Sequence, residues 1–127
     1  MDLDGLDVDP DERILLTSLP SLDVVRRLAG RLENGIIAAL AEGEEMYAAR
    51  RELAGLENVL VTPGSAEDIP WKDEFFSLVA DPAGRYTLSE GAQREMERVL
   101  APSGRLFRGD TLLREAELRD RSPEPLQ

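Results

Sequence analysis

The sequence contains neither cysteine nor histidine among its 127 residues. Without cysteine the chain can form no disulfide, has no thiol nucleophile and cannot hold zinc or an iron–sulfur cluster through thiolates. Without histidine it has no Ser-His-Asp triad, no imidazole base and no imidazole ligand, so no metal site is expected. Lys72 is the only lysine, and no Gly-Lys-Ser/Thr step exists, which excludes a phosphate-binding P-loop. These absences exclude most of the catalytic sites that a sequence can reveal.

Positive charge is scarce as well. Acidic residues outnumber basic residues 26 to 15, which gives a formal net charge of −11 and a pI near 4.4. A chain this acidic repels phosphate backbones and anionic lipids, so we expect no nucleic-acid partner and no membrane-surface partner. No apolar run approaches the roughly 18 residues that a membrane span needs. The N-terminal residues lack the basic region and apolar stretch of a signal peptide, so the cytoplasm is the expected location.

The length predicts one folded domain between two short tails. Residues 1–12 carry six acidic residues together with the helix breakers Gly5 and Pro10, and they are predicted to form a disordered acidic arm. Residues 13–120 are predicted to form the folded domain. Residues 121–127, which include two prolines, are predicted to form an extended C-terminal tail.

Within the domain, short apolar segments alternate with segments of helical periodicity. Strands are predicted at residues 13–17, 35–40, 58–62, 75–80 and 105–108, with a turn at residues 102–104. Helices are predicted to begin at Ser21, Glu44, Ser89 and Asp110, the last with Leu112, Leu113 and Ala116 inward. This order predicts an α/β fold with a parallel sheet covered on both faces. In such sheets ligands bind beyond the carboxyl ends of the strands, so a site would use residues 17–22, 41–44, 62–68 and 81–86.

Three stretches of the sequence carry a recognisable pattern. Residues 63–71 read Pro-Gly-Ser-Ala-Glu-Asp-Ile-Pro-Trp, residues 75–79 read Phe-Phe-Ser-Leu-Val, and residues 94–106 read Arg-Glu-Met-Glu-Arg-Val-Leu-Ala-Pro-Ser-Gly-Arg-Leu. They resemble the class I S-adenosylmethionine-dependent methyltransferases of the type 11-like group. Corresponding family segments read Gly-Asp-Ala-Glu-Asp-Leu-Pro-Phe, Phe-Asp-Leu-Val and Arg-Glu-Ile-x-Arg-Val-Leu-Lys-Pro-Gly-Gly-x-Leu. The resemblance implies a Rossmann-like sheet of about five parallel strands in the order 3-2-1-4-5, without the family's last two strands.

The resemblance also implies a glycine-rich turn after the first strand, where the family binds its cofactor, S-adenosylmethionine. Aligning the first strand with the family places Ser18, Pro20 and Leu22 on the three glycines of that turn. Glycine permits a positive φ and a close approach of the main chain to a ligand, whereas proline fixes φ at about −65° and has no N–H. No glycine lies between Gly5 and Gly30, so a shifted alignment does not supply the missing turn.

The other cofactor contacts that the resemblance implies are weaker than in the family. The acid that holds the ribose hydroxyls falls on Ala41, and Glu42 lies one residue late, which can turn its side chain to the opposite face. The family's adenine-side aspartate falls on Ser65, and the backbone of Ala66 could still meet an adenine edge. Each lost charge-assisted hydrogen bond is worth about 1.5–3 kcal/mol. We therefore expect no bound cofactor, or S-adenosylmethionine only in an atypical pocket.

Asp81 and Tyr86 follow the fourth strand, where a carboxylate and a phenol could take a proton from an amine. The Asp-Pro step is also typical of a strand terminator and turn, and we expect this structural role. No catalytic residue is predicted. Trp71, Phe75 and Phe76 are expected to serve as core and loop anchor.

The sequence leaves more than one function open. The leading hypothesis is a non-catalytic, methyltransferase-like domain that serves as an interaction or scaffold module. The alternative is a working S-adenosylmethionine-dependent methyltransferase with an atypical cofactor pocket, and a small-ligand sensor that uses the residual cleft also stays open. Because the last two strands of the family are missing, the fifth strand is expected to be an exposed sheet edge. A protein partner or a second copy of the chain is expected to pair there.

Overall fold

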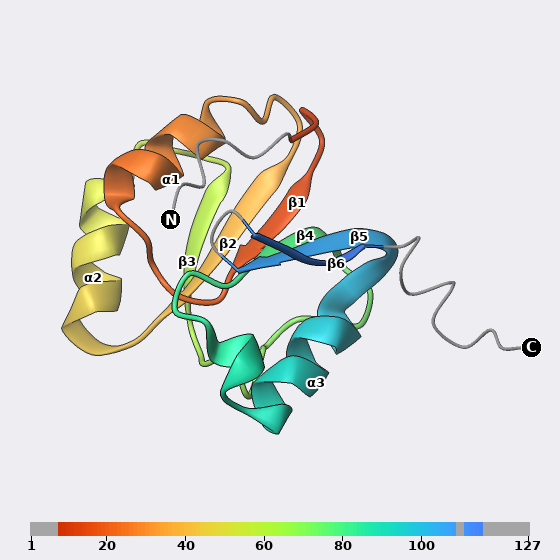
Figure 1. Cartoon of the computed structure of the whole chain (residues 1–127). Coiled ribbons are helices and arrows are strands. Elements are labelled where there is room, and N and C mark those ends of the chain that lie inside the picture. The colour runs from red at the N-terminus through yellow and green to blue at the C-terminus, as the bar shows by residue number, and fades with distance from the viewer. Residues whose placement is uncertain (1–7, 109–110, 116–127) are drawn as a thin grey trace, which may run out of the picture.

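The computed structural model describes residues 8–108 and 111–115, and Figure 1 shows the arrangement of their helices and strands. The elements in chain order are β1 (Arg13–Leu16), α1 (Leu22–Ala29), β2 (Ile36–Ala41), α2 (Gly43–Glu52), β3 (Val59–Pro63), β4 (Phe76–Ala80), the 3-10 helix η2 (Arg85–Thr87), α3 (Glu90–Val99), β5 (Leu100–Arg108) and β6 (Thr111–Glu115). None of the helices in the described ranges is long and apolar enough to cross a membrane.

The strands form one sheet in the order β3-β2-β1-β4-β5-β6. The first five strands in this order are parallel, which confirms the predicted α/β class and the predicted order 3-2-1-4-5. The direction of winding reverses between β1 and β4. The turn predicted at residues 102–104 is an irregularity inside β5, because the pairing with β4 passes from Leu100 directly to Arg105.

Helices cover both faces of the sheet, as Figure 1 shows, with α1 and α2 on one face and α3 on the other. Alternate residues of β1 serve the two faces: Ile14 and Leu16 pack in the cluster with α1 and α2, whereas Leu15 packs in the cluster with α3. This alternation follows from the period-2 geometry of a strand. The strands therefore read as continuous apolar runs because both of their faces are buried.

The predicted helix starts are confirmed at the two serine caps. The Ser21 hydroxyl accepts a hydrogen bond from Val24 N at the start of α1, and the Ser89 hydroxyl accepts one from Ala92 N at the start of α3. These bonds satisfy backbone donors that have no partner within the helix.

The last predicted element is wrong. The sequence pattern predicts a helix from Asp110, but Thr111–Glu115 form β6, which pairs antiparallel with β5. Asp110 and Ala116 lie outside the described residues. A five-residue segment is too short for its apolar residues to distinguish helical periodicity from strand periodicity. The neighbouring strand β5 offers this segment a row of backbone hydrogen-bonding groups, which favours a strand. The expected exposed edge at β5 is therefore also wrong, because β6 occupies it.

The predicted boundary at residue 13 is too late for residues 8–12, which belong to the folded domain. Val8 packs against the core cluster of α1 and α2, and the Glu12 side chain is only 7% exposed. Ile36 N donates to Glu12 O at 3.0 Å, and Arg105 pairs with the Glu12 carboxylate at 2.8 Å. The rest of the predicted arm, residues 1–7, and the predicted tail, residues 121–127, lie outside the described residues.

Candidate functional site

The residues that the sequence proposed as a cofactor site lie at the carboxyl ends of three neighbouring strands. Ser18 and Pro20 lie in the loop after β1, Leu22 begins α1, Glu42 lies directly before α2, and Ser65 and Ala66 follow β3. Because β1, β2 and β3 are parallel and adjacent, these residues share one edge of the sheet. This edge is where ligands bind in open α/β sheets.

The loop between β1 and α1 directs its apolar side chains to the core. Leu19 and Leu22 are half-buried and pack against the cluster formed with α1 and α2. Among the described residues, positive φ values occur only at Glu74, Gly43, Gly64 and Gly84, so this loop contains none. Its conformation is one that ordinary residues adopt, and Pro20 contributes no N–H to it.

A buried hydrogen bond joins the ends of the two strands between which the winding reverses. Thr17 Oγ1 donates to Asp81 Oδ1 at 2.7 Å, and Thr17 N donates to Ala80 O at 3.0 Å. Thr17 is 5% exposed and Asp81 is fully buried. The second carboxylate oxygen, Asp81 Oδ2, accepts a hydrogen bond from Tyr86 N at 2.7 Å. Both oxygens of Asp81 thus have donors within the fold, which is what a buried carboxylate requires.

Asp81 and Tyr86 thus both have hydrogen-bond partners within the fold. The Tyr86 hydroxyl donates to the Glu97 carboxylate of α3, which fixes the segment after β4 against that helix. The sequence suggested Asp81 as a strand terminator, and it gave no sign of the bond to Thr17. The two residues are 64 positions apart, and only the pairing of β1 with β4 brings them together.

Glu42 differs from these residues because its side chain has no partner among the described residues. It is exposed, its backbone is extended, and its side chain makes no capping hydrogen bond to α2. The residue before it, Ala41, pairs with Pro63 of β3, so Glu42 lies beside the start of the loop that follows β3. Gly43 then turns the chain into α2 with a φ of 65°. Glu42 is therefore the available carboxylate at the end of β2.

The two candidate residues after β3 lie in a closed turn. Ser65 O accepts a hydrogen bond from Asp68 N at 3.1 Å, and Ala66 is 2% exposed with its side chain in the core cluster of α3. The next residue, Glu67, pairs with Arg85 of η2 at 2.8 Å. A hydrogen bond from Ser89 and the Arg85 guanidinium both lower the pKa of Glu67 below its ordinary value. The turn after β3 is thus joined to the segment after β4.

A second set of charged residues, which lies within the segment 94–106, fixes the rest of this loop. Arg98 of α3 donates to Ile69 O at 2.8 Å and to Trp71 O at 2.9 Å. Glu95, one helical turn earlier, accepts from Ile69 N at 2.9 Å, and its hydrogen bond with Arg98 lowers its pKa. The same ion pair raises the pKa of Arg98. In the sequence, the spacing of Glu95 and Arg98 indicates an ion pair along a helix. It does not indicate that the two side chains also bind the loop between β3 and β4.

The aromatic residues of this loop pack as expected. Trp71 stacks on Phe75 with ring centroids 5.3 Å apart, and both meet the fully buried Phe76 edge-on. Such contacts stabilise a core by burial and by ring geometry. The three rings anchor the loop between β3 and β4 to the core of α3.

Comparison with known proteins shows the fold of this chain. No protein-family model matches the chain, and no curated protein sequence matches it significantly. Solved structures do match: an S-adenosylmethionine-dependent methyltransferase from Aquifex aeolicus has a TM-score of 0.68 at 20% identity, over 94% of this chain and 74% of that protein. The YcgJ protein from Bacillus subtilis has a TM-score of 0.65 at 23% identity, over 79% of this chain.

These similarities establish a fold shared with methyltransferases rather than an activity. The chain spans 44% of YcgJ, so more than half of that protein has no counterpart here. The [4+2]-cyclase SpnF matches equally well, with a TM-score of 0.65 at 25% identity, over 78% of this chain and 38% of that protein. Neighbours with different reported activities thus share this architecture, and function has to be argued from the site.

Proposed function

We propose that this chain, whose fold is that of the class I S-adenosylmethionine-dependent methyltransferases, is a non-catalytic interaction module. The observation that carries the proposal is the hydrogen bond between Thr17 Oγ1 and Asp81 Oδ1. In open α/β sheets the ligand crevice lies where the winding reverses, which here is between β1 and β4. Two buried side chains bonded across this point favour a packed sheet end over an open crevice.

The loop after β1 supports the same proposal. A nucleoside cofactor needs bare main chain and free N–H groups close to it. This loop has negative φ throughout, has no N–H at Pro20, and uses the N–H of Thr17 in a bond to Ala80. Its two leucines pack into the core. We infer that these residues do not fit S-adenosylmethionine, so we derive no methyl-transfer step.

One observation favours a second candidate, a methyltransferase with an atypical pocket. Glu42 is exposed at the end of β2 and lacks a hydrogen-bond partner among the described residues. A carboxylate there could accept hydrogen bonds from two ribose hydroxyls. This candidate rests on Glu42 alone.

The sheet edges argue against a partner that adds a strand. At β3, Arg50 Nε donates to Val61 O at 3.0 Å, and Pro63 has no N–H to offer. At β6, the pairing with β5 shifts register between Leu106 and Phe107, and such bulges are typical of protected edges. We therefore propose that the interaction module binds its partner through a helix face.

The test is thermal melting of the full chain with and without millimolar S-adenosylhomocysteine. We expect no change in the melting temperature. Ligand at about a hundred times its dissociation constant would stabilise the fold by about 2.7 kcal/mol, which is several degrees at this size. A shift of that size overturns the proposal. A shift that is lost in the Glu42→Gln variant would support the second candidate, because it would show that Glu42 helps to bind the cofactor product.

A further inference from the structure

Helix α2 leaves one of its faces without a partner among the described residues. Met46 and Ala49 are buried against the sheet, and Glu52 on one flank pairs with Arg26 of α1 at 3.2 Å. The opposite side carries a groove of about 600 Å³, which is lined by Glu44, Glu45, Tyr47, Ala48 and Arg51. In the described part of the chain none of these five side chains makes a hydrogen bond or an ion pair, although Arg26, Arg50, Arg85, Arg98 and Arg105 all do.

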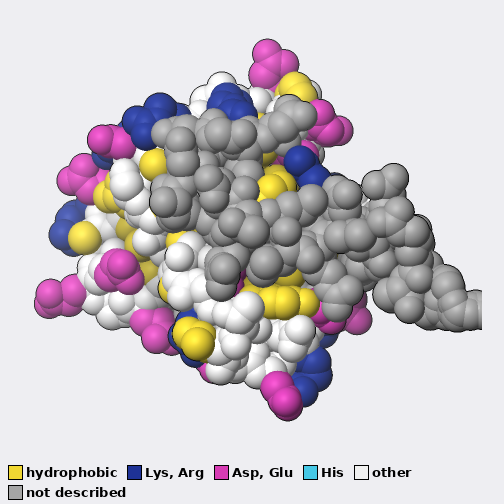
Figure 2. Space-filling model, viewed as in Figure 1, with side chains coloured by type: hydrophobic (Ala, Val, Ile, Leu, Met, Phe, Trp, Pro, Cys, Tyr) yellow, Lys and Arg dark blue, Asp and Glu magenta, His cyan; other side chains and the backbone are white. Residues whose placement is uncertain are grey.

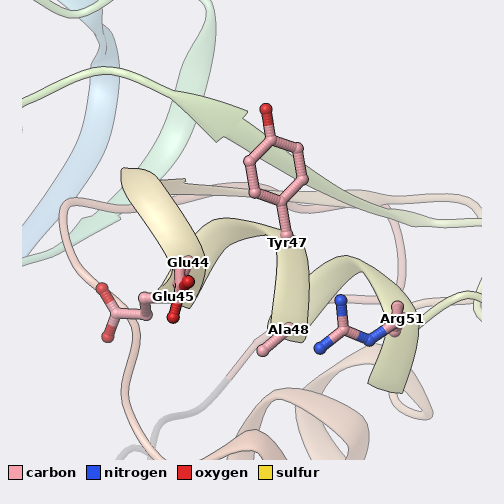
Figure 3. A pocket seen from close by; sticks show the side chains of 5 residues that line it. All are labelled: Glu44, Glu45, Tyr47, Ala48 and Arg51. Atoms are coloured by element: carbon pink, nitrogen blue, oxygen red, sulfur yellow. The ribbon is translucent and has the colours of Figure 1, made fainter.

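The side chains of this face follow a charge pattern along the helix. Figure 3 shows Glu44 and Glu45 at one end of α2, Arg51 at the other end, and Tyr47 projecting away from the helix between them. Glu44, Ala48 and Arg51 are spaced four and then three residues apart, so they form one stripe along the helix surface. Tyr47 is 57% exposed beside this stripe. In Figure 2, acidic, basic and apolar side chains are likewise interspersed on the side of the molecule where α2 lies.

This stripe is complementary to itself when it is reversed. In two antiparallel copies of the helix, a two-fold axis between positions 47 and 48 brings Glu44 of one copy opposite Arg51 of the other. The same axis brings Tyr47 opposite Ala48, so that a large ring faces a small side chain. A closed two-fold contact requires the same patch on both partners, and opposite charges in register set its orientation.

We propose that the outer face of α2 (Glu44, Tyr47, Ala48 and Arg51) is the contact between two copies of this chain, packed antiparallel about that axis. The inference rests on the proposed function as an interaction module, and it names the partner as a second copy. It also moves the expected self-association from the sheet edge to a helix face. The protected edges at β3 and β6 agree with this change.

The size and chemistry of the face predict a weak, salt-sensitive dimer. A contact made by one helix falls below the roughly 1,200–2,000 Å² that stable interfaces bury. Two exposed ion pairs contribute modestly and are screened by salt. We therefore expect a dissociation constant of about 100 μM at low salt, with a several-fold increase at about 0.5 M salt.

The test is sedimentation equilibrium of the full chain at low salt, from about 10 μM to about 1 mM, on the native protein and five variants. Glu44→Arg and Arg51→Glu should each raise the dissociation constant about tenfold, because each places like charges opposite one another. The double variant with both changes should restore the native value. Glu33→Arg, with the same change of charge at an exposed residue outside α2, should leave the dissociation constant unchanged. The fifth variant, Ala48→Trp, should abolish dimers, because a bulky side chain at this position would hold the two helices apart. Circular dichroism verifies that each variant is folded.

A native chain that stays monomeric over this range overturns the inference, and so does a dimer that neither charge reversal weakens. Failure of the double variant to restore association also overturns it, because a variant weakened only by poor folding would not be rescued by a second reversal. These outcomes are separate from the test of the proposed function. Binding of S-adenosylhomocysteine would overturn the non-catalytic role without affecting the dimer, and a monomer would leave the melting result unchanged.

Discussion

Thr17 Oγ1 lies 2.7 Å from Asp81 Oδ1, between the ends of two strands that run side by side where the winding of the sheet reverses. Both residues are buried, and Asp81 has no exposed surface at all. A buried carboxylate without donors is costly, so the threonine hydroxyl stabilises the end of β4 as well as its own loop. This relationship predicts that Asp81 contributes to the stability of the fold through its bond to Thr17.

Replacement of Thr17 by valine should therefore destabilise the fold. Valine has the same shape but no hydroxyl, so Asp81 Oδ1 would lose its only side-chain donor among the described residues. We expect the free energy of unfolding to fall by about 1–3 kcal/mol, measured by urea denaturation. Thr17→Ser, which keeps the hydroxyl, is the matched control and should lose less than half as much. Equal stabilities for the native chain and Thr17→Val would contradict the assigned role.

A second prediction concerns the loop that α3 holds. From its planar guanidinium, Arg98 donates to the carbonyls of Ile69 and Trp71 as well as to Glu95. The compact ammonium group of a lysine cannot reach all of these acceptors at once. Arg98→Lys should lower the free energy of unfolding by about 1.5–3 kcal/mol and speed hydrogen exchange at the amides of residues 69–71. Arg94→Lys, at an exposed position of the same helix, should change neither quantity. Unchanged exchange in Arg98→Lys would show that the loop is held by other contacts.

The lowered pKa of Glu95 predicts a pH dependence of stability. Its hydrogen bond from Arg98 holds the pKa in the folded chain below the ordinary value of 4.5, so the unfolded chain binds more protons in this range. The stabilisation is therefore present above pH 4.5 and is lost as the pH falls through the folded-state pKa. Glu95→Gln keeps an acceptor for Ile69 N but cannot titrate. Its stability should fall less steeply below pH 4.5 than that of the native chain, as measured by denaturation across pH.

Gly35 provides a prediction about close packing of the backbone. A Cβ atom at this position would lie 2.1 Å from Glu12 O, because Ile36 N donates to that same oxygen. Gly35→Ala should destabilise the chain by about 1–3 kcal/mol, since backbone has to move to admit the methyl group. At Gly55 an added Cβ would meet nothing within 4 Å, and no positive φ is needed there. Gly55→Ala should be neutral or should stabilise the chain by about 0.4–1 kcal/mol.

The sequence predicted the fold well where the local pattern of apolar and capping residues agrees with the tertiary structure. The apolar strands of the parallel sheet, the serine caps of α1 and α3, and the strand order all follow from patterns of neighbouring residues and from the resemblance to a known family. Prediction failed at Thr111–Glu115, because a five-residue segment has no decisive period and the open side of β5 determined its conformation. It failed at Glu12 for a related reason. The charge of that residue suggested solvent, but Ser77 and Arg105 lie beside it in the fold and make burial favourable.

For the candidate site, the sequence by itself determined which groups are present: no histidine, no cysteine, and no glycine in the loop after β1. It also determined that these groups follow parallel strands and share one edge. Only the tertiary structure decided how they are used, because Thr17 and Asp81 meet through strand pairing, and Glu42 is left without a partner among the described residues. The physical reason is that hydrogen bonds and burial depend on groups far apart in the chain. Residue type fixes what a side chain can donate or accept, and the fold determines what lies within reach of it.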